Sequence, residues 1–279
     1  MIVLSETLQA KYDRMCEILR SLEHVAVAFS AGVDSTLVLK VALDTLGSPK
    51  VIAATGDSES LARAEFDEAR RLTEQLGAQH VVLKTDEFQN EDYLANPENR
   101  CYYCKTTLYT HLDKYIAEHG INAIVNGINA DDYGDWRPGI QAAEEHAVRA
   151  PIAEAGITKA EVRTLSEWLG LPTFDKPASP CLSSRVQYGE QITPEKLRMI
   201  ERAEALLKSL GFRECRVRHH DNLARIEVPL EDIARIAEPE FRARLDAALH
   251  ELGYTYVTLD LRGFRSGSLN EAISLNIDR

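Results

Sequence analysis

Four short apolar runs alternate with amphipathic segments in the first half of the chain, and this alternation most limits the possible fold. The apolar runs are HVAVAF (24–29), KVIAAT (50–55), QHVVLK (79–84) and NAIVNG (122–127). Amphipathic segments near 34–46, 59–76 and 104–119 separate them. Strand–helix–strand repeats of this length form parallel strand pairs with right-handed crossovers. The sequence therefore predicts a doubly wound α/β fold with a mainly parallel sheet, whose ligands bind beyond the carboxyl ends of the strands.

A different pattern follows the stretch LPTFDKPASPCLSSRVQYGEQITPEK, which contains four prolines and is typical of a long loop or a domain junction. Beyond it we expect a helix from Thr193 to about Ser209, adjacent strands at 214–220 and 223–229, a helix near 230–251 and a last strand at 254–261. This is a smaller C-terminal α+β domain. We therefore predict two domains, 1–182 and 183–279.

The bulk composition is that of an ordinary globular protein with an acidic balance. The 279 residues carry 44 Asp and Glu against 32 Lys and Arg, a formal net charge of −12. Nucleic-acid binding relies on clustered basic residues, so we expect no stable nucleic-acid partner. No apolar run reaches the roughly 18–20 residues of a membrane span, and the first residues lack the pattern of a signal peptide. We expect a cytoplasmic protein with no membrane partner.

A small-residue turn joins the first expected strand to the first expected helix. It consists of Ser30, Ala31, Gly32, Val33, Asp34 and Ser35. Small residues let backbone amides approach an anion at a helix N-terminus, where the helix dipole also favours negative charge. The turn lacks the Gly-Lys-Ser/Thr ending of P-loop kinases and GTPases. Asp34 inside an anion site needs a bridging cation, which indicates Mg²⁺. A turn without a ligand is the structural alternative.

Three of the five cysteines fall in segments suited to chemistry. Cys101 and Cys104 form a C-x-x-C pair at an expected helix start, and Cys181 lies in the proline-rich loop. Cys16 and Cys215 lie in expected helix and strand contexts that are typical of buried thiols. A redox pair, a zinc site and chance are all compatible with the C-x-x-C spacing. Three thiolates with an open fourth position also suit a [4Fe–4S] cluster.

The turn FSAGVDS resembles the S-G-G-x-D-S loop of the PP-loop ATP pyrophosphatases, which cleave ATP between the α and β phosphates and form an adenylate of their substrate. Ala31 replaces the first glycine of that pattern. A Cβ there costs about 1 kcal/mol if the position requires a positive φ. The segment NGINADDYGDWRPG resembles the second signature of the same proteins. Asp131 and Asp132 in it either assist metal or substrate, or act as capping and turn residues.

Longer matches narrow the resemblance. KPASPCLSSRVQYGEQIT resembles the sulfur-donor loop of the LarE family, PP-loop sulfurtransferases that help to build the nickel-pincer nucleotide cofactor of lactate racemase. RVRHHDNLARIEVP and YVTLDLRGFRSGSLN match the same family, so the resemblance covers nearly the whole chain. It implies an enzyme that binds ATP and pyridinium-3,5-biscarboxylic acid mononucleotide, adenylates a carboxylate and replaces its oxygen with sulfur. It also implies a homo-oligomer.

The family uses two sources of sulfur. In one branch a single loop cysteine gives up its sulfur and becomes dehydroalanine; in the other, three cysteines hold a [4Fe–4S] cluster that delivers sulfide from an upstream donor. The presence of Cys101, Cys104 and Cys181 favours the cluster branch. One alternative is Cys181 as a consumed donor, with zinc or nothing at Cys101 and Cys104. The others are a tRNA thiolase on the same scaffold, an amide-forming synthetase, in which the cysteines would have no role, and a non-catalytic nucleotide-binding or zinc-stabilised module.

Arginines are expected to bind the anionic substrate. Arg185, in CLSSR, corresponds to an active-site arginine of the family, and we assign it a catalytic role with Asp34 and Cys181. Arg216 and Arg218 share one face of an expected strand and suit a phosphate or carboxylate, unless that face is solvated.

Weaker expectations concern the acidic and C-terminal residues of the same region. Glu227 is expected near the two strand arginines, where it balances their charge or holds Mg²⁺, and Glu204 is a weaker partner. Arg262, Arg265, Ser266 and Ser268 lie among glycines and are expected to form an anion nest or a subunit contact.

Overall fold

The computed structural model describes residues 3–134 and 137–265 and divides the chain into two compact units. The first unit contains the residues up to 87 together with 99–179, and the second contains 88–98 together with the residues from 180 onwards. Nothing in the sequence pattern indicated that residues 88–98 leave the first unit and pack with the second.

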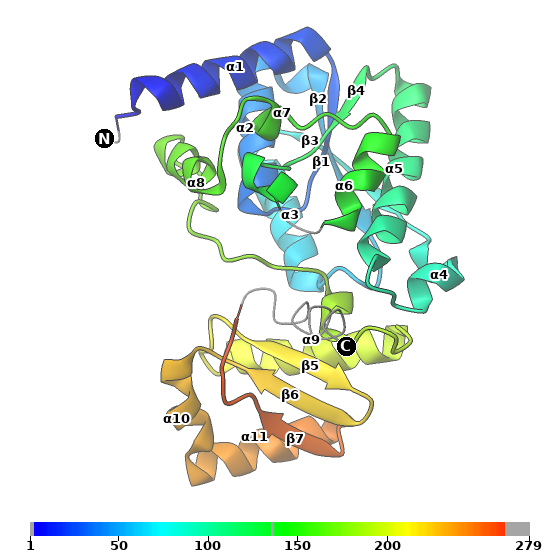
Figure 1. Ribbon diagram of the computed structural model, residues 1–279, viewed down its shortest axis with the longest axis vertical. Coiled ribbons are helices and arrows are strands. Elements are labelled where there is room, and N and C mark those ends of the chain that lie inside the picture. Colours follow the sequence, from blue (N-terminus) through cyan, green and yellow to red (C-terminus); the bar gives the residue numbers. More distant parts are fainter. Residues whose placement is uncertain (1–2, 135–136, 266–279) are drawn as a thin grey trace. The chain divides into compact units, whose positions relative to one another are not determined.

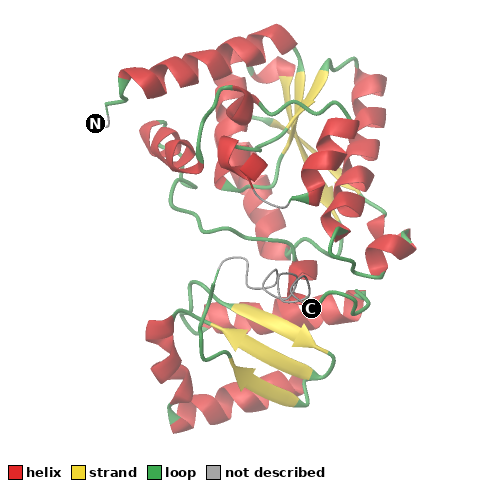
Figure 2. Ribbon diagram, viewed as in Figure 1, coloured by secondary structure: helices red, strands yellow, loops and turns green. Residues whose placement is uncertain are grey.

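A parallel sheet of four strands forms the centre of the first unit (Figures 1 and 2). The strands are β1 (Val25–Ala28), β2 (Val51–Asp57), β3 (Gln79–Lys84) and β4 (Ala123–Val125), in the order β3-β2-β1-β4. All three neighbouring pairs are parallel. The predicted α/β class is therefore confirmed, and the turn after β1 lies at the carboxyl end of a central strand.

Helices cover both faces of this sheet because side chains alternate along each strand. Val25 and Val27 of β1 pack into a core with α1 (Glu6–Leu22), α2 (Val33–Leu46), α3 (Arg63–Leu76), α7 (Pro151–Glu154) and α8 (Lys159–Trp168). Ala26 faces the opposite way and packs into a core with α5 (Arg100–His119) and α6 (Pro138–Glu145). This two-sided burial is the doubly wound arrangement that the sequence predicts.

Two helix boundaries in the first unit differ from the expected ones. α3 begins at Arg63 rather than near 59, because Ser58 and Ser60 bond to one another through their hydroxyls (2.9 Å) and hold a bend before it. α5 begins at Arg100 rather than near 104. The C-x-x-C pair therefore lies within the first turns of that helix.

The second unit contains a sheet of three strands. β5 (Arg216–His220) and β6 (Leu223–Glu227) are antiparallel, and β7 (Tyr256–Leu259) runs parallel to β6. α4 (Glu91–Leu94), α9 (Pro194–Ser209), α10 (Ile233–Ala237) and α11 (Pro239–Glu251) complete the unit. Thr193 caps α9 by accepting a hydrogen bond from the amide of Lys196 (3.3 Å), as the sequence predicts.

The helical stretch expected near 230–251 consists of three short elements. Residues Leu230–Asp232 form a 3₁₀ turn, and α10 and α11 meet at Glu238, before Pro239. Proline excludes the helical conformation for the residue in front of it, so the helix restarts there. None of the helices in the described ranges combines the length and the apolar character needed to cross a membrane.

Candidate functional site

The turn after β1 closes on itself through its two serines. The hydroxyls of Ser30 and Ser35 lie 3.1 Å apart, and the Ser35 hydroxyl also donates to the carbonyl of Gly32 (3.2 Å). Gly32 is the N-cap of α2 and no side chain caps the helix. The first amides of α2 have no intrahelical acceptors, and together with the helix dipole they favour an anion.

Ala31 has a left-handed backbone conformation. Its φ is +57° and its side chain is fully buried. A Cβ in this region costs about 1–2 kcal/mol, so the position is strained where the family pattern has glycine. The carbonyl of Ala31 accepts a hydrogen bond from Lys176 (3.1 Å), which holds the strained peptide in place.

The second signature packs directly against the start of α2. A Cβ on Gly127 would lie 2.8 Å from the amide nitrogen of Ser35 and 3.0 Å from two atoms of Asp34. Asn129 donates to Asp34 (3.4 Å) and to Asp132 (2.9 Å) through its side-chain amide. The two segments that sequence analysis singled out separately therefore form one structure.

The contacts of Asp131 and Asp132 favour a role as capping and turn residues over a role in binding metal or substrate. Asp132 is buried and accepts from the backbone amide of Asn129 (3.0 Å), which shapes the 3₁₀ turn Ala130–Gly134. Asp131 accepts from the amide of Lys159 (2.8 Å) at the start of α8. Both carboxylates thus hold the loop next to Asp34.

Two lysines reach the turn from elsewhere in the first unit, and sequence analysis missed both. Lys159 forms an ion pair with Asp34. Lys176 pairs with Glu65 (2.7 Å) in addition to its bond to Ala31. The turn contains no lysine of its own, and residues 159 and 176 carried no local motif that related them to it. Contacts this distant in sequence are visible only in the folded chain.

The carboxylate of Asp34 suits the Mg²⁺ that the sequence predicts. Its side chain is 22% exposed, at the first turn of α2. Hard oxygen donors of this kind are the ligands Mg²⁺ prefers. Among the described residues, no three His, Cys, Asp or Glu side chains form a group that could hold a metal ion.

The three cysteines of interest are distributed over the two units. Cys101 and Cys104 belong to the first unit, in α5, and Cys181 belongs to the second, where it precedes the 3₁₀ turn Leu182–Arg185. Each is at least partly exposed and none forms a disulfide. Burial instead raises the pKa of Cys215 to about 11, so that thiol stays protonated and inert.

Arg185 is buried beside the cysteine loop. Its guanidinium donates to the carbonyls of Pro180 (2.6 Å) and Cys181 (3.0 Å), and it forms a two-pronged ion pair with Glu204 (2.8 and 3.0 Å). Glu204 also accepts from the amide of Val217 (3.1 Å). The arginine is thereby fixed between the cysteine loop, α9 and β5, a stronger role for Glu204 than the sequence suggested.

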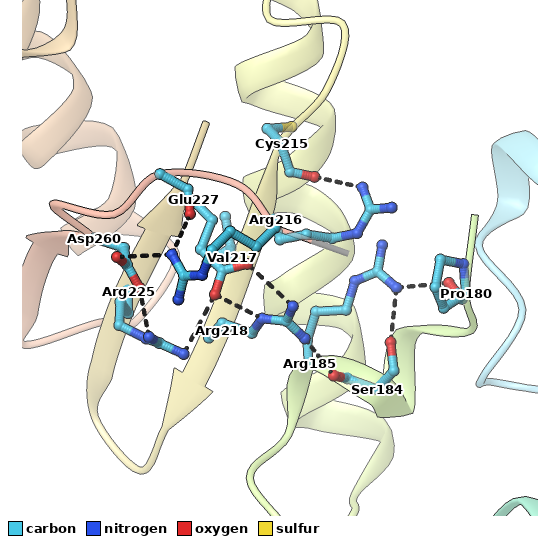
Figure 3. Close-up of polar contacts among 12 residues, drawn as sticks. Pro180, Ser184, Arg185, Cys215, Arg216, Val217, Arg218, Arg225, Glu227 and Asp260 are labelled. Atoms are coloured by element: carbon cyan, nitrogen blue, oxygen red, sulfur yellow. Dashed lines mark hydrogen bonds and ion pairs between the residues drawn. The ribbon is translucent and has the colours of Figure 1, made fainter. Parts of the chain in front are cut away.

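One face of the C-terminal sheet is charged and the other is apolar. Val217, Ala224 and Ile226 pack into the core of the unit. Arg216 and Arg218 point to the opposite face and are 9% and 6% exposed, so the alternative of a solvated face is wrong. Figure 3 shows their guanidinium groups gathered with those of Arg185 and Arg225.

Two glutamates balance the three most buried arginines of this cluster. Glu227 pairs with Arg218 (3.0 Å), Glu204 pairs with Arg185, and the guanidinium of Arg216 lies over the ring of Phe264 (5.0 Å). Burial lowers the pKa of Arg216, and repulsion from Arg185 lowers it further. A bound anion would relieve both effects on Arg216.

Glu227 lies among these arginines as expected, but its surroundings favour charge balance over metal binding. It is fully buried, and a second arginine, Arg225, approaches its carboxylate at 3.3 Å. Arg218 also donates to the carbonyl of Ser184 (2.8 Å), which connects the charged face to the cysteine loop.

Residues 88–98 hold the cysteine loop from the other side. The Tyr93 and Ser183 hydroxyls form a buried hydrogen bond (2.7 Å), and the Asn96 side chain donates to the carbonyls of Gln187 (2.7 Å) and Glu190 (3.1 Å). Asn96 itself has a φ of +54°. Sequence analysis missed this anchor because the segment is short, polar and far from the loop in sequence.

The structure describes two of the four C-terminal residues that are expected to form an anion nest, Arg262 and Arg265. Arg265 lies 3.5 Å from Asp260 and bonds to the carbonyl of Gly263 (2.9 Å), and the backbone amide of Arg262 also donates to Asp260 (2.8 Å). Ser266 and Ser268 lie outside the described residues. The anion nest predicted here stays a prediction.

The chain is similar in sequence to several known proteins. The chain is 45% identical over 267 residues to an uncharacterised protein, slr1717, of Synechocystis, covering 96% of this chain and 99% of that one. It is 41% identical over 270 residues to the pyridinium-3,5-bisthiocarboxylic acid mononucleotide synthase of Lactiplantibacillus plantarum, covering 96% of each. A shorter match, 30% over 158 residues, is to the argininosuccinate synthase of Haloarcula marismortui and covers 53% of this chain and 37% of that one. No family model matches the chain.

Proposed function

The chain belongs to the LarE family, and from this premise we propose that it is an ATP-dependent sulfurtransferase that converts a carboxylate of pyridinium-3,5-biscarboxylic acid mononucleotide into a thiocarboxylate. The relative from L. plantarum is named for the bisthiocarboxylic product of this conversion. The single observation that carries the proposal beyond family membership is the contact of Arg185 with the carbonyl of Cys181 (3.0 Å), because it joins a cationic cluster to the sulfur-bearing loop.

The ATP-binding part of the proposal uses the first unit. The amides at the start of α2, with Ser30 and Ser35, bind phosphate oxygens of ATP, and Asp34 holds the Mg²⁺ that neutralises them. The substrate carboxylate attacks the α-phosphorus, the bond to the bridging oxygen breaks and pyrophosphate leaves. The resulting acyl-adenylate has AMP as its leaving group, so the carbonyl carbon becomes open to a sulfur nucleophile.

The substrate-binding part uses the second unit. Arg216 and Arg218 bind the phosphate of the mononucleotide, and Arg185 binds the reacting carboxylate. Ion pairs with Glu204 and Glu227 already hold Arg185 and Arg218 in place, so these side chains lose little freedom when an anion binds. Arg262 and Arg265 extend this cationic surface.

Sulfur is supplied at the cysteines. Three cysteines that are exposed at least in part and form no disulfide match the donor set of a [4Fe–4S] cluster, and we propose that Cys101, Cys104 and Cys181 hold one. When bound, such a cluster would supply sulfide, received from an upstream donor, to the activated carboxylate. In the alternative, Cys181 gives up its own sulfur and becomes dehydroalanine.

Anaerobic purification with iron and sulfide reconstitution tests the sulfur source. The proposal predicts about four irons per chain by metal analysis, a brown protein and repeated turnover with added sulfide. A Cys101→Ala variant is expected to lose the cluster and multiple turnover, whereas Cys16→Ala, which changes a buried thiol of α1, retains both. A colourless wild type whose mass falls by one H₂S after a single turnover contradicts the cluster and favours consumption of Cys181.

The family resemblance also implies self-association. We propose a homo-oligomer, and analytical ultracentrifugation across a concentration series is the test. A monomer at every concentration contradicts it.

A further inference from the structure

Lys159 is placed where a helix normally disfavours a cation. It is the first residue of α8, and the positive end of a helix dipole is at its N-terminus. The backbone amide of Lys159 is held by Asp131 (2.8 Å), while its ammonium group reaches Asp34. The backbone is therefore anchored while the side chain, 39% exposed, retains room to move.

Both oxygens of the Asp34 carboxylate are engaged within the first unit. Oδ1 accepts from the side-chain amide of Asn129 (3.4 Å), and Oδ2 pairs with Lys159. Asn129 is buried and is also bonded to Asp132, so it cannot leave easily. A cation that binds Asp34 directly therefore competes with the ammonium group of Lys159 for the carboxylate.

We propose that Lys159 is an exchangeable counter-ion that couples metal binding to nucleotide binding in this turn. It neutralises Asp34, which keeps a divalent cation without nucleotide from binding tightly. When MgATP binds, Asp34 turns to the metal and Lys159 moves to the phosphate oxygens, where it replaces the lysine that a P-loop carries within its own sequence. The inference rests on the proposed use of ATP but not on sulfur transfer.

Lys176 provides a matched control. It is also a lysine from outside the turn and also forms an ion pair, but with Glu65 rather than Asp34. Its ammonium bonds to the carbonyl of Ala31, at the opposite end of the turn from Asp34. Replacement of Lys176 by a neutral residue removes one positive charge near the turn, as replacement of Lys159 does. It leaves the ion pair between Lys159 and Asp34 intact.

Lys159→Met and Lys176→Met are to be compared in two titrations. Mn²⁺ without nucleotide is followed by loss of the free-ion EPR signal, and the Mg²⁺ complex of α,β-methylene-ATP is followed by calorimetry. We expect Lys159→Met to bind Mn²⁺ about threefold more tightly and the nucleotide about tenfold more weakly. Lys176→Met is expected to weaken nucleotide binding without tightening Mn²⁺ binding.

Two further variants keep the test decisive. Lys159→Arg is expected to restore most of the nucleotide affinity, and the double variant Lys159→Met with Asp34→Asn is expected to lose the gain in Mn²⁺ affinity. Unchanged or weaker Mn²⁺ binding in a folded Lys159→Met variant overturns the inference, as does equal tightening in Lys176→Met. Because neither titration requires turnover, a wild type that binds nucleotide but transfers no sulfur refutes the proposed function and leaves this inference standing.

Discussion

A Cβ on Gly127 would lie 2.8 Å from the amide nitrogen of Ser35, so the loop after β4 touches the start of α2 backbone to backbone. Gly127→Ala therefore forces one of the two segments to shift, at a cost of about 1–3 kcal/mol in the free energy of unfolding. We also expect weaker MgATP binding, because the shifted amides belong to the turn that we propose to bind phosphate. Urea unfolding and nucleotide titration measure the two effects.

Gly134→Ala is the control for this change. Among the described residues, no atom lies within 4 Å of a Cβ at Gly134, at the end of the same loop. Its effect on unfolding is expected to stay within about 0.5 kcal/mol. Equal effects of the two substitutions on the free energy of unfolding would show that the close approach of Gly127 to Ser35 does not affect stability.

Ala31→Gly tests the strain in the turn. At a φ of +57° the substitution removes the Cβ penalty of about 1–2 kcal/mol and adds unfolded-state entropy worth up to about 1 kcal/mol. Stability is therefore expected to stay level or to rise. Ala10→Gly on the exposed side of α1 is expected to lower it by about 1 kcal/mol. Similar losses in both variants, measured by thermal unfolding, would exclude strain at Ala31.

Glu204 is expected to be essential to the structure of the charged face. Glu204→Gln leaves the Arg185 guanidinium, 3% exposed, without its carboxylate, and breaking a buried pair from one side costs about 3–5 kcal/mol. Glu195→Gln removes a carboxylate from the same helix, where its partner Arg198 is 61% exposed, and is expected to cost under about 0.5 kcal/mol. Chemical denaturation measures the free energy of unfolding of both variants. Similar losses in the two would contradict the argument that burial makes the Glu204 pair costly to break.

Arg216 is expected to contribute to substrate affinity more than to turnover. Its pKa is lowered by burial and by the neighbouring Arg185, and a bound phosphate relieves both unfavourable effects. Arg216→Met is expected to raise KM for the mononucleotide about tenfold with a smaller change in kcat. The exposed Arg213 offers the control Arg213→Met. A fall in kcat with an unchanged KM would contradict a role of Arg216 in substrate binding.

The sequence was sufficient for the parts of this protein that depend on local pattern. The short apolar run of β1 and the proline at the start of α9 locate the strand and the helix directly. The ion pair of Lys159 with Asp34 joins residues 125 positions apart, and the anchor of Tyr93 on Ser183 joins residues 90 apart. A local sequence pattern cannot indicate pairs this far apart. The polar contacts that orient the turn and the cysteine loop could therefore be identified only from the folded structure.

The central claim is that this chain activates a carboxylate with ATP and replaces its oxygen with sulfur. The direct test incubates the reconstituted protein anaerobically with pyridinium-3,5-biscarboxylic acid mononucleotide, MgATP and sulfide, and follows the nucleotides and the pyridinium product by mass spectrometry. We expect one AMP and one pyrophosphate for each oxygen replaced by sulfur, and neither product in the Asp34→Asn variant. ADP in place of AMP, or AMP formed without any thiocarboxylate, would contradict it.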